Sequence, residues 1–338
     1  MRKKQNRRSS VQSGNAVTAA LIVVVASLLM AVIGVVYGQR IIDSVIASNF
    51  SAAPRVASVK QSLELTDRAK TIFYASQPSI EDKQHFNDSC KSTERTTAML
   101  GCYYRRQIYL FDVTNNELAG AVEVTAAHEL LHAAYERLPF YEKPKIDTLV
   151  ERQYEKVKDQ KAIKSLVAYY EKAEPGAVPN ELHSIIGTTI SSLDPELETY
   201  YARYFTDRRA IVAMNERYSA VFQKVQDEAD SLSTQIKSEG PAIEAALAQY
   251  EADRKQLESD ITVFNERAAG GGFSSQSSFQ VARSSLVARV ATLSAERESI
   301  NRNVDTYNKL VEQLRALSVR SDELNKSING ISAPETKL

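Results

Sequence analysis

The motif His128-Glu129-Leu130-Leu131-His132 constrains this 338-residue chain more than any other feature. Residues four apart lie on the same face of a helix, so His128 and His132 can direct both imidazoles at one metal ion. Glu129 projects beside them, where its carboxylate can take a proton from a water molecule on that ion. The chain has only 4 histidines, so a chance match of this kind is rare. The alternative is a pair of partly buried histidines with ordinary hydrogen-bond partners.

The N-terminus carries a basic segment followed by a long apolar run. Residues 1–15 contain Lys and Arg but no acid, and an uncharged apolar stretch follows from Ala16 to about Tyr37. About 20 apolar residues suffice to cross a bilayer as a helix, and basic residues before the run place the N-terminus in the cytoplasm. We therefore predict a basic cytoplasmic tail (1–15), a single-pass signal-anchor (16–38) in the cell membrane, a linker (39–58) and an extracytoplasmic main part. The alternative is a cleaved signal peptide, since small residues near Ala47 and Ala52 resemble a cleavage site.

The two cysteines agree with this topology. Cys90 and Cys102 lie 12 positions apart, and in an oxidising compartment such a pair predicts one local disulfide. Two reduced, partly buried thiols are the alternative. A place in the metal site is not expected, because the pair lacks the close spacing of a CxxC motif.

Composition indicates a globular protein, and the helical patterns along the chain predict that it is mainly α-helical. Hydrophobic residues make up 43% and charged residues 25% of the chain, which is typical of folded domains. The formal net charge is +0, so no basic field predicts binding to nucleic acid. We expect one α+β domain over residues 59–209, with a strand at 107–113 and later helices at about 144–172 and 179–192. A further helix should begin at Asp194, which can cap it ahead of a proline.

From about residue 210 apolar residues recur every seven positions. The repeats are Ile236, Ile243, Tyr250, Leu257 and Phe264, then Leu286, Leu293, Ile300, Tyr307 and Leu314. Three glycines at 270–272 separate the two arms. This pattern predicts an antiparallel coiled-coil hairpin over residues 210–330, kinked at Pro241, through which the chain forms a homo-oligomer or binds a protein partner. A disordered tail (331–338) is expected after it.

A catalytic zinc ion generally takes three protein ligands and keeps a fourth position for water. The third ligand must therefore come from beyond the motif helix. Glu181 and His183 are the candidates, near the start of the helix expected at 179–192. They are two positions apart, about 200° around a helix, so both should not bind one ion. The alternative role of Glu181 is that of an acid complementing the helix dipole.

The motif and this later helix together resemble the gluzincin branch of the zincin metallopeptidases, in a bacterial-type, membrane-anchored form. In gluzincins an HExxH motif on one helix is completed by a Glu on a later helix, often within an Asn-Glu pair. The resemblance covers His128, Glu129, His132, Asn180 and Glu181. It implies a zincin-like domain with one Zn²⁺ per chain, held by the two histidines and Glu181, and it implies that Glu129 is the general base.

The resemblance also implies an activity, zinc-dependent hydrolysis of peptide or protein substrates. Zinc would activate the water, and Glu129 would pass its proton to the leaving amine. The developing oxyanion needs a further donor, and the candidates are His183, Tyr200, Tyr201 and Tyr204, although tyrosines clustered on a helix often only pack. The sequence departs from several gluzincins one turn after Glu181, where Ile185 replaces an Asp that holds a histidine.

In zincins a strand before the active helix commonly pairs with extended substrate. We expect the 107–113 strand to be that sheet edge. Two alternatives to a peptidase are a non-catalytic coiled-coil envelope scaffold or regulator with a zinc-binding zincin-like domain, and a structural zinc site. A fourth protein ligand would mark the structural site, and open coordination would argue against it.

Overall fold

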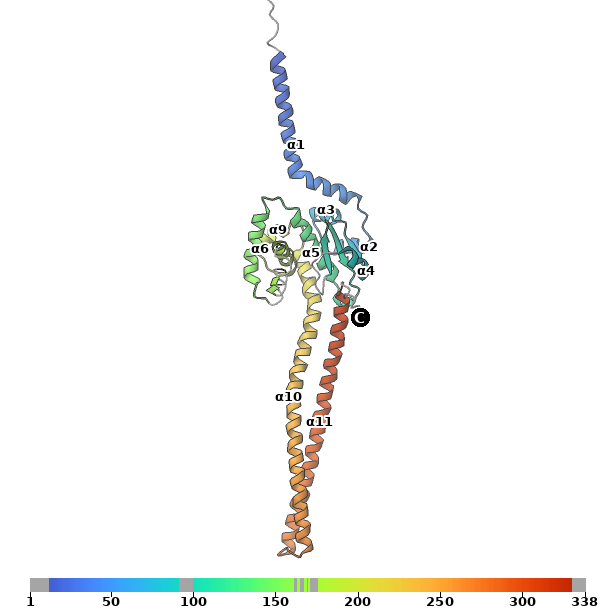
Figure 1. Cartoon of the computed structure of the whole chain (residues 1–338), viewed down its shortest axis with the longest axis vertical. Coiled ribbons are helices and arrows are strands. Elements are labelled where there is room, and N and C mark those ends of the chain that lie inside the picture. The colour runs from blue at the N-terminus through green and yellow to red at the C-terminus, as the bar shows by residue number, and fades with distance from the viewer. Residues whose placement is uncertain are drawn as a thin grey trace, which may run out of the picture. The chain divides into compact units, whose positions relative to one another are not determined.

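The structure, a computed structural model, describes residues 12–90, 100–160, 163–164, 167–168, 170 and 176–329 (Figure 1). The predicted tail 331–338 and most of the basic segment 1–15 lie outside these residues. The chain divides into two compact units. Ala220–Lys326 forms the second unit, and the first contains every predicted site residue.

The first long helix, α1 (Gln12–Asn49), includes the predicted anchor and continues through residues 39–49 of the predicted linker. Its large apolar side chains at residues 21–25 are exposed. Within the described part of the chain, no helix combines the length and the apolarity that a bilayer crossing requires. The predicted anchor lies only partly inside that description, which leaves out the side chains of residues 16–17, 28–33 and 35–36.

Short helices make up most of the first unit. Local chemistry begins several of them: the Thr66 hydroxyl accepts the backbone N–H of Ala69, and Asp82 caps the next helix in the same way. Proline stands in the first turn of four others, where its missing N–H costs nothing. The helices are α2 (Pro54–Ser62), α3 (Asp67–Ala75), α4 (Lys83–Ser89), η1 (Asn116–Leu118), α5 (Ala121–Glu136), α6 (Lys143–Val157), α8 (Val178–Thr189) and α9 (Pro195–Tyr201).

A three-stranded mixed sheet accompanies these helices. Its strands are β1 (Ser79–Glu81), β2 (Gly101–Tyr104) and β3 (Gln107–Phe111), in the order β1-β3-β2. The β3 strand pairs parallel with β1 and antiparallel with β2. The expectation that residues 107–113 form the sheet edge is therefore wrong. Strand β3 is central, with Ile108 and Leu110 fully buried, and β2 is an edge strand.

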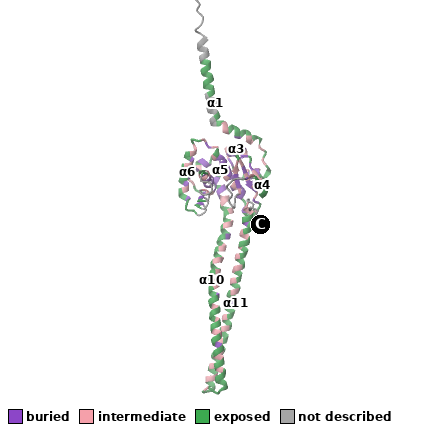
Figure 2. Cartoon of the chain, in the orientation of Figure 1, coloured by how far each residue is buried: buried purple, intermediate pink, exposed green. Residues whose placement is uncertain are grey.

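Helix α5 lies at the centre of the first unit. It packs against α8 and also contacts α3, β2 and β3. Its Leu130 and Leu131 are fully buried, and Figure 2 shows the buried residues of the unit gathered around α5 and the sheet. The fold therefore brackets the HExxH helix between a later helix and a strand, and both can contribute groups to one site.

The second unit is the predicted helical hairpin. Helix α10 (Arg208–Ala269) runs through Pro241 as one element, and α11 (Gln276–Ile328) follows a glycine turn in which Gly271 has a φ of 66°. Three phenylalanines close the turn, with ring centroids 5.3 to 5.4 Å apart: Phe264, Phe273 and Phe279. The heptad residues Ile243, Leu257 and Ile300 are buried. The sequence repeat thus correctly predicted two long packed helices.

Candidate metal centre

Helix α5 brings the two motif histidines together. It begins after Gly120, whose φ of 99° suits glycine, and His128 and His132 follow on one face. Their Nε2 atoms lie 3.0 Å apart. The His132 side chain is 9% exposed and that of His128 is 22% exposed, so the pair is reachable by solvent from the His128 side.

Helix α8 supplies the third residue from its first turn. One Glu181 carboxylate oxygen lies 3.4 Å from His132 Nε2, and the other lies 3.6 Å from His128 Nε2. One ligand atom from each of these three residues lies within 4.8 Å of the others. Among the described residues, no fourth His, Cys, Asp or Glu joins this group, and His183 is not part of it.

The donor set suits a divalent transition metal. Glu181 Oε2 is buried and has no hydrogen-bond partner among the described atoms, so it retains lone pairs for a cation. Burial lowers the pKa of His132 to about 4, which keeps its imidazole neutral and able to ligate. Two imidazole nitrogens and one carboxylate are a usual zinc set, and three protein ligands with an open position are typical of catalytic sites.

Glu129 is buried beside the triad without being part of it. Its burial raises the pKa of the carboxyl to about 7, although His128 and the backbone N–H of Tyr103 oppose the shift. Strand β2 packs directly on this side chain, because a Cβ added at Gly101 would lie 3.0 Å from Glu129 Cγ and 2.5 Å from Thr125 Cγ2. A carboxylate held in this way with a pKa near neutrality has the properties of a general base.

Two further side chains support the ligands. Asn180 lies beside the His132 side chain and raises its pKa against the effect of burial, and Tyr170 lies beside the Glu181 carboxylate and lowers its pKa. Burial alone would raise the pKa of Glu181, but the two histidines and Tyr170 outweigh burial and lower it. The Asn-Glu pair drew attention to Asn180 in the sequence without giving it a role. Nothing in the sequence indicated Tyr170.

The four candidate oxyanion donors form a buried cluster. His183 Nε2 and the Tyr200 hydroxyl are 2.8 Å apart, and the Tyr201 hydroxyl donates to the backbone oxygen of His183 at 2.7 Å. The Tyr204 hydroxyl lies 3.5 Å from that of Tyr200. Burial lowers the pKa of His183 to about 3, so this imidazole is neutral. These contacts join α8 to α9, and a role in stabilising an oxyanion remains a prediction.

Gly187 allows α8 to approach α5 closely. A Cβ at this position would lie 2.4 Å from Leu131 Cδ1 and 2.8 Å from Tyr201 Cε1, too near for either to remain in place. No sequence pattern identified this glycine, since its role depends on a contact between two helices.

Replacing Gly187 with Ala should destabilise the protein by about 1–3 kcal/mol, because the added methyl overpacks the interface between α5 and α8. The movement of α8 should also weaken metal binding through Glu181. Chemical denaturation and a zinc titration would measure both effects. Gly176→Ala is the matched control, since nothing lies within 4 Å of a Cβ there. Equal stability of the two variants would contradict the close approach.

The predicted disulfide between Cys90 and Cys102 is present, with Cα atoms 6.1 Å apart. It joins the end of α4 to β2, one residue after Gly101. The covalent link therefore restrains the strand that packs on Glu129. A disulfide also favours an extracytoplasmic location for this domain.

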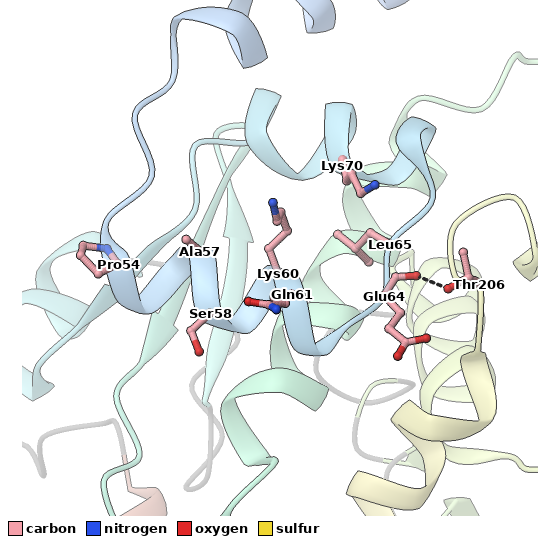
Figure 3. A pocket seen from close by; sticks show the side chains of 9 residues that line it. All are labelled: Pro54, Ala57, Ser58, Lys60, Gln61, Glu64, Leu65, Lys70 and Thr206. Carbon is pink, nitrogen blue, oxygen red and sulfur yellow. Dashed lines mark hydrogen bonds between the residues drawn. The ribbon is translucent and has the colours of Figure 1, made fainter.

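A separate cavity of about 710 Å³ lies along α2, and Figure 3 shows its lining. Lys60 and Lys70 reach it from α2 and α3, and the Thr206 hydroxyl donates to the backbone oxygen of Glu64 at its end. None of its lining residues belongs to the triad, so this cavity is not the metal centre.

No protein-family model matches the chain, and neither a curated protein nor a solved structure matches it. The function is therefore inferred from the residues and geometry of the site itself. The structure gives a mainly helical domain in which His128, His132 and Glu181 are arranged as in an HExxH site completed by a later glutamate.

Proposed function

We propose that this protein is a zinc-dependent metallopeptidase of the zincin type, with gluzincin-like ligands. The observation that carries the proposal is the convergence of His128, His132 and Glu181 next to a buried carboxylate on the same helix turn. Glu129 would be redundant in a site that only held a metal. Burying the Glu129 carboxylate without a cationic partner among the described ion pairs costs free energy, and a role as the catalytic base would explain why it is buried there.

The residues of the site divide the proposed reaction between them. When bound, zinc supplies Lewis-acid polarisation of the scissile carbonyl and makes water acidic enough to react near neutral pH. Glu129 accepts the proton of the attacking water at its carboxylate and delivers it to the leaving amine. Asn180 and Tyr170 lie beside His132 and Glu181, where polar neighbours of metal ligands generally help to orient them.

Strand β2 is the proposed binding edge for substrate. Among the described strands it has a neighbour on one side only. The backbone N–H of Tyr103 reaches Glu129, so the other side of β2 faces the site. An extended peptide pairing with this edge would place a backbone amide beside the base.

We also propose that residues 16–38 anchor the protein in a membrane and place the catalytic domain outside the cytoplasm. The uninterrupted helix α1 and its exposed apolar residues support the anchor, and the Cys90–Cys102 disulfide supports the location. The hairpin is proposed to bind a protein partner or a second copy of the chain.

The full chain, purified in detergent, should contain about one zinc ion and cleave members of a peptide library. A chelator should stop cleavage by removing the ion, and added zinc should restore it. Elemental analysis and mass spectrometry of the digest are the measurements. His132→Ala is the control, because it should lose both zinc and cleavage. Stoichiometric zinc without cleavage of any peptide would instead support the non-catalytic scaffold or regulator.

A further inference from the structure

Buried polar contacts join the end of α1 to the edge strand of the sheet. Arg137, which follows α5, places its Nε atom 3.1 and 3.0 Å from the two carboxylate oxygens of Asp43. Its Nη1 atom donates to the Tyr103 hydroxyl at 2.9 Å and to the backbone oxygen of Ala133 at 3.0 Å. The side chains of Arg137 and Asp43 are only 4% and 5% exposed.

This ion pair is unusual for a segment that leads out of a predicted anchor. A spacer between a membrane helix and a domain needs no buried charge, and burying two charges incurs a desolvation penalty that often exceeds their attraction. Asp43 also accepts a hydrogen bond from Gln39, at 2.9 Å. The contacts therefore fix the end of α1 in one position on the domain, and stability alone is a weak explanation for them.

The same contacts lead to Glu129. The Tyr103 side chain is held by Arg137, and the Tyr103 backbone N–H lies close enough to the Glu129 carboxylate to lower its pKa. Two residues earlier on the strand, Gly101 packs against the Glu129 side chain without room for a methyl group. A shift of β2 would therefore move both the Tyr103 N–H and the packing at Gly101 that orient the Glu129 carboxylate.

We propose that Asp43 and Arg137 are positioning residues for the peptidase reaction, acting through Tyr103 and strand β2 to hold Glu129 in place. The inference rests on the proposed function and extends it. The end of α1 is then a component of the active domain, and whatever displaces α1 from the domain lowers turnover without touching the metal ligands. If the ion pair had only a structural role, its loss would lower the stability of the domain and leave kcat unchanged.

The test uses the full chain and two mild substitutions. Tyr103→Phe removes one hydroxyl, and Asp43→Asn removes one charge while keeping the shape of the side chain. We expect each variant to bind zinc as the parent does, to keep KM within about twofold and to lose kcat by on the order of 10-fold. Because both act through Arg137, the double variant should lose little more than the worse single variant. Arg203→Lys, in the half-exposed pair with Glu142, is the matched control and should keep its kcat.

Zinc content, unfolding midpoint, KM and kcat are measured for each protein. Lower midpoints with unchanged kcat per bound zinc would overturn the inference, because the contacts would then be only structural. Fully multiplicative losses in the double variant would overturn it as well, since the residues would then act independently. A zinc-loaded parent that cleaves no peptide would refute the proposed function itself, and the inference would fall with it.

Discussion

Replacing Glu129 with Gln should nearly abolish peptide hydrolysis while zinc remains bound. The amide has the shape of the carboxylate but cannot accept a proton, and Glu129 lies outside the ligand group. Removing a general base of this kind lowers kcat by about 10²–10⁴-fold. The buried carboxyl already has a pKa near 7, so a neutral amide should be tolerated at this position. The measurement is kcat together with the zinc content of the same sample.

Two controls make this result specific. Glu123→Gln changes a glutamate on the same helix that is outside the triad, and it should leave both kcat and zinc content unchanged. His132→Ala should lose zinc and turnover together. A Glu129→Gln protein as active as the parent would show that the water is activated in another way, and the proposed mechanism would be wrong.

The metal-binding half of the site was predictable because it is local in sequence. Helical periodicity alone places His128 and His132 together, and α5 has that geometry. The third ligand was harder. Sequence spacing alone does not decide whether Glu181 or His183 is the third ligand, and only the resemblance to gluzincins favours the glutamate. The structure separates them physically: Glu181 faces the histidine pair, whereas His183 points into the tyrosine cluster on another side of α8.

The strand order shows why part of the fold was not predictable. Residues 107–113 carry the strongest strand pattern, and the resemblance to zincins predicts this strand to be the substrate-binding edge. The pattern is strong because β3 is buried between two neighbours. Its partner β1 has only three residues, too few to give a periodic signal. The strong strand pattern therefore reflects burial in the centre of the sheet, and β2, the proposed substrate-binding edge, has a weaker pattern.

Contacts between residues far apart in the sequence could not be predicted from sequence patterns either. Asp43 and Arg137 are 94 positions apart, and each looks like an ordinary surface charge in the sequence. The roles of Gly101 and Gly187 also depend on which atoms approach them in the folded state. The heptads of the hairpin are the opposite case. Their repeat continues for many turns, so the predicted buried positions Ile243, Leu257 and Ile300 follow from local periodicity.

Substitution of Glu181 by Gln should weaken zinc binding by about 100-fold or more, since even outer partners of a ligand are worth 10–100-fold. The carboxylate supplies one of three donors and the only negative charge in the triad. Competition with a chelating zinc indicator would give the Kd. The stabilisation by zinc should fall in parallel, because a ligand present at 100 times its Kd adds about 2.7 kcal/mol to the free energy of unfolding.

His183→Asn is the decisive comparison for this prediction. His183 is fully buried and contacts Tyr200, so the substitution should lower stability through lost packing. Its zinc Kd should nevertheless stay within a few-fold of the parent value, because His183 is outside the ligand group. The opposite pattern, with zinc lost from His183→Asn and retained by Glu181→Gln, would make His183 the third ligand. His183 contacts Tyr200 of α9, whereas Glu181 faces the histidine pair, so that result would mean that the ion is not held by the His128, His132 and Glu181 group, and the proposed mechanism would lose its ligand set.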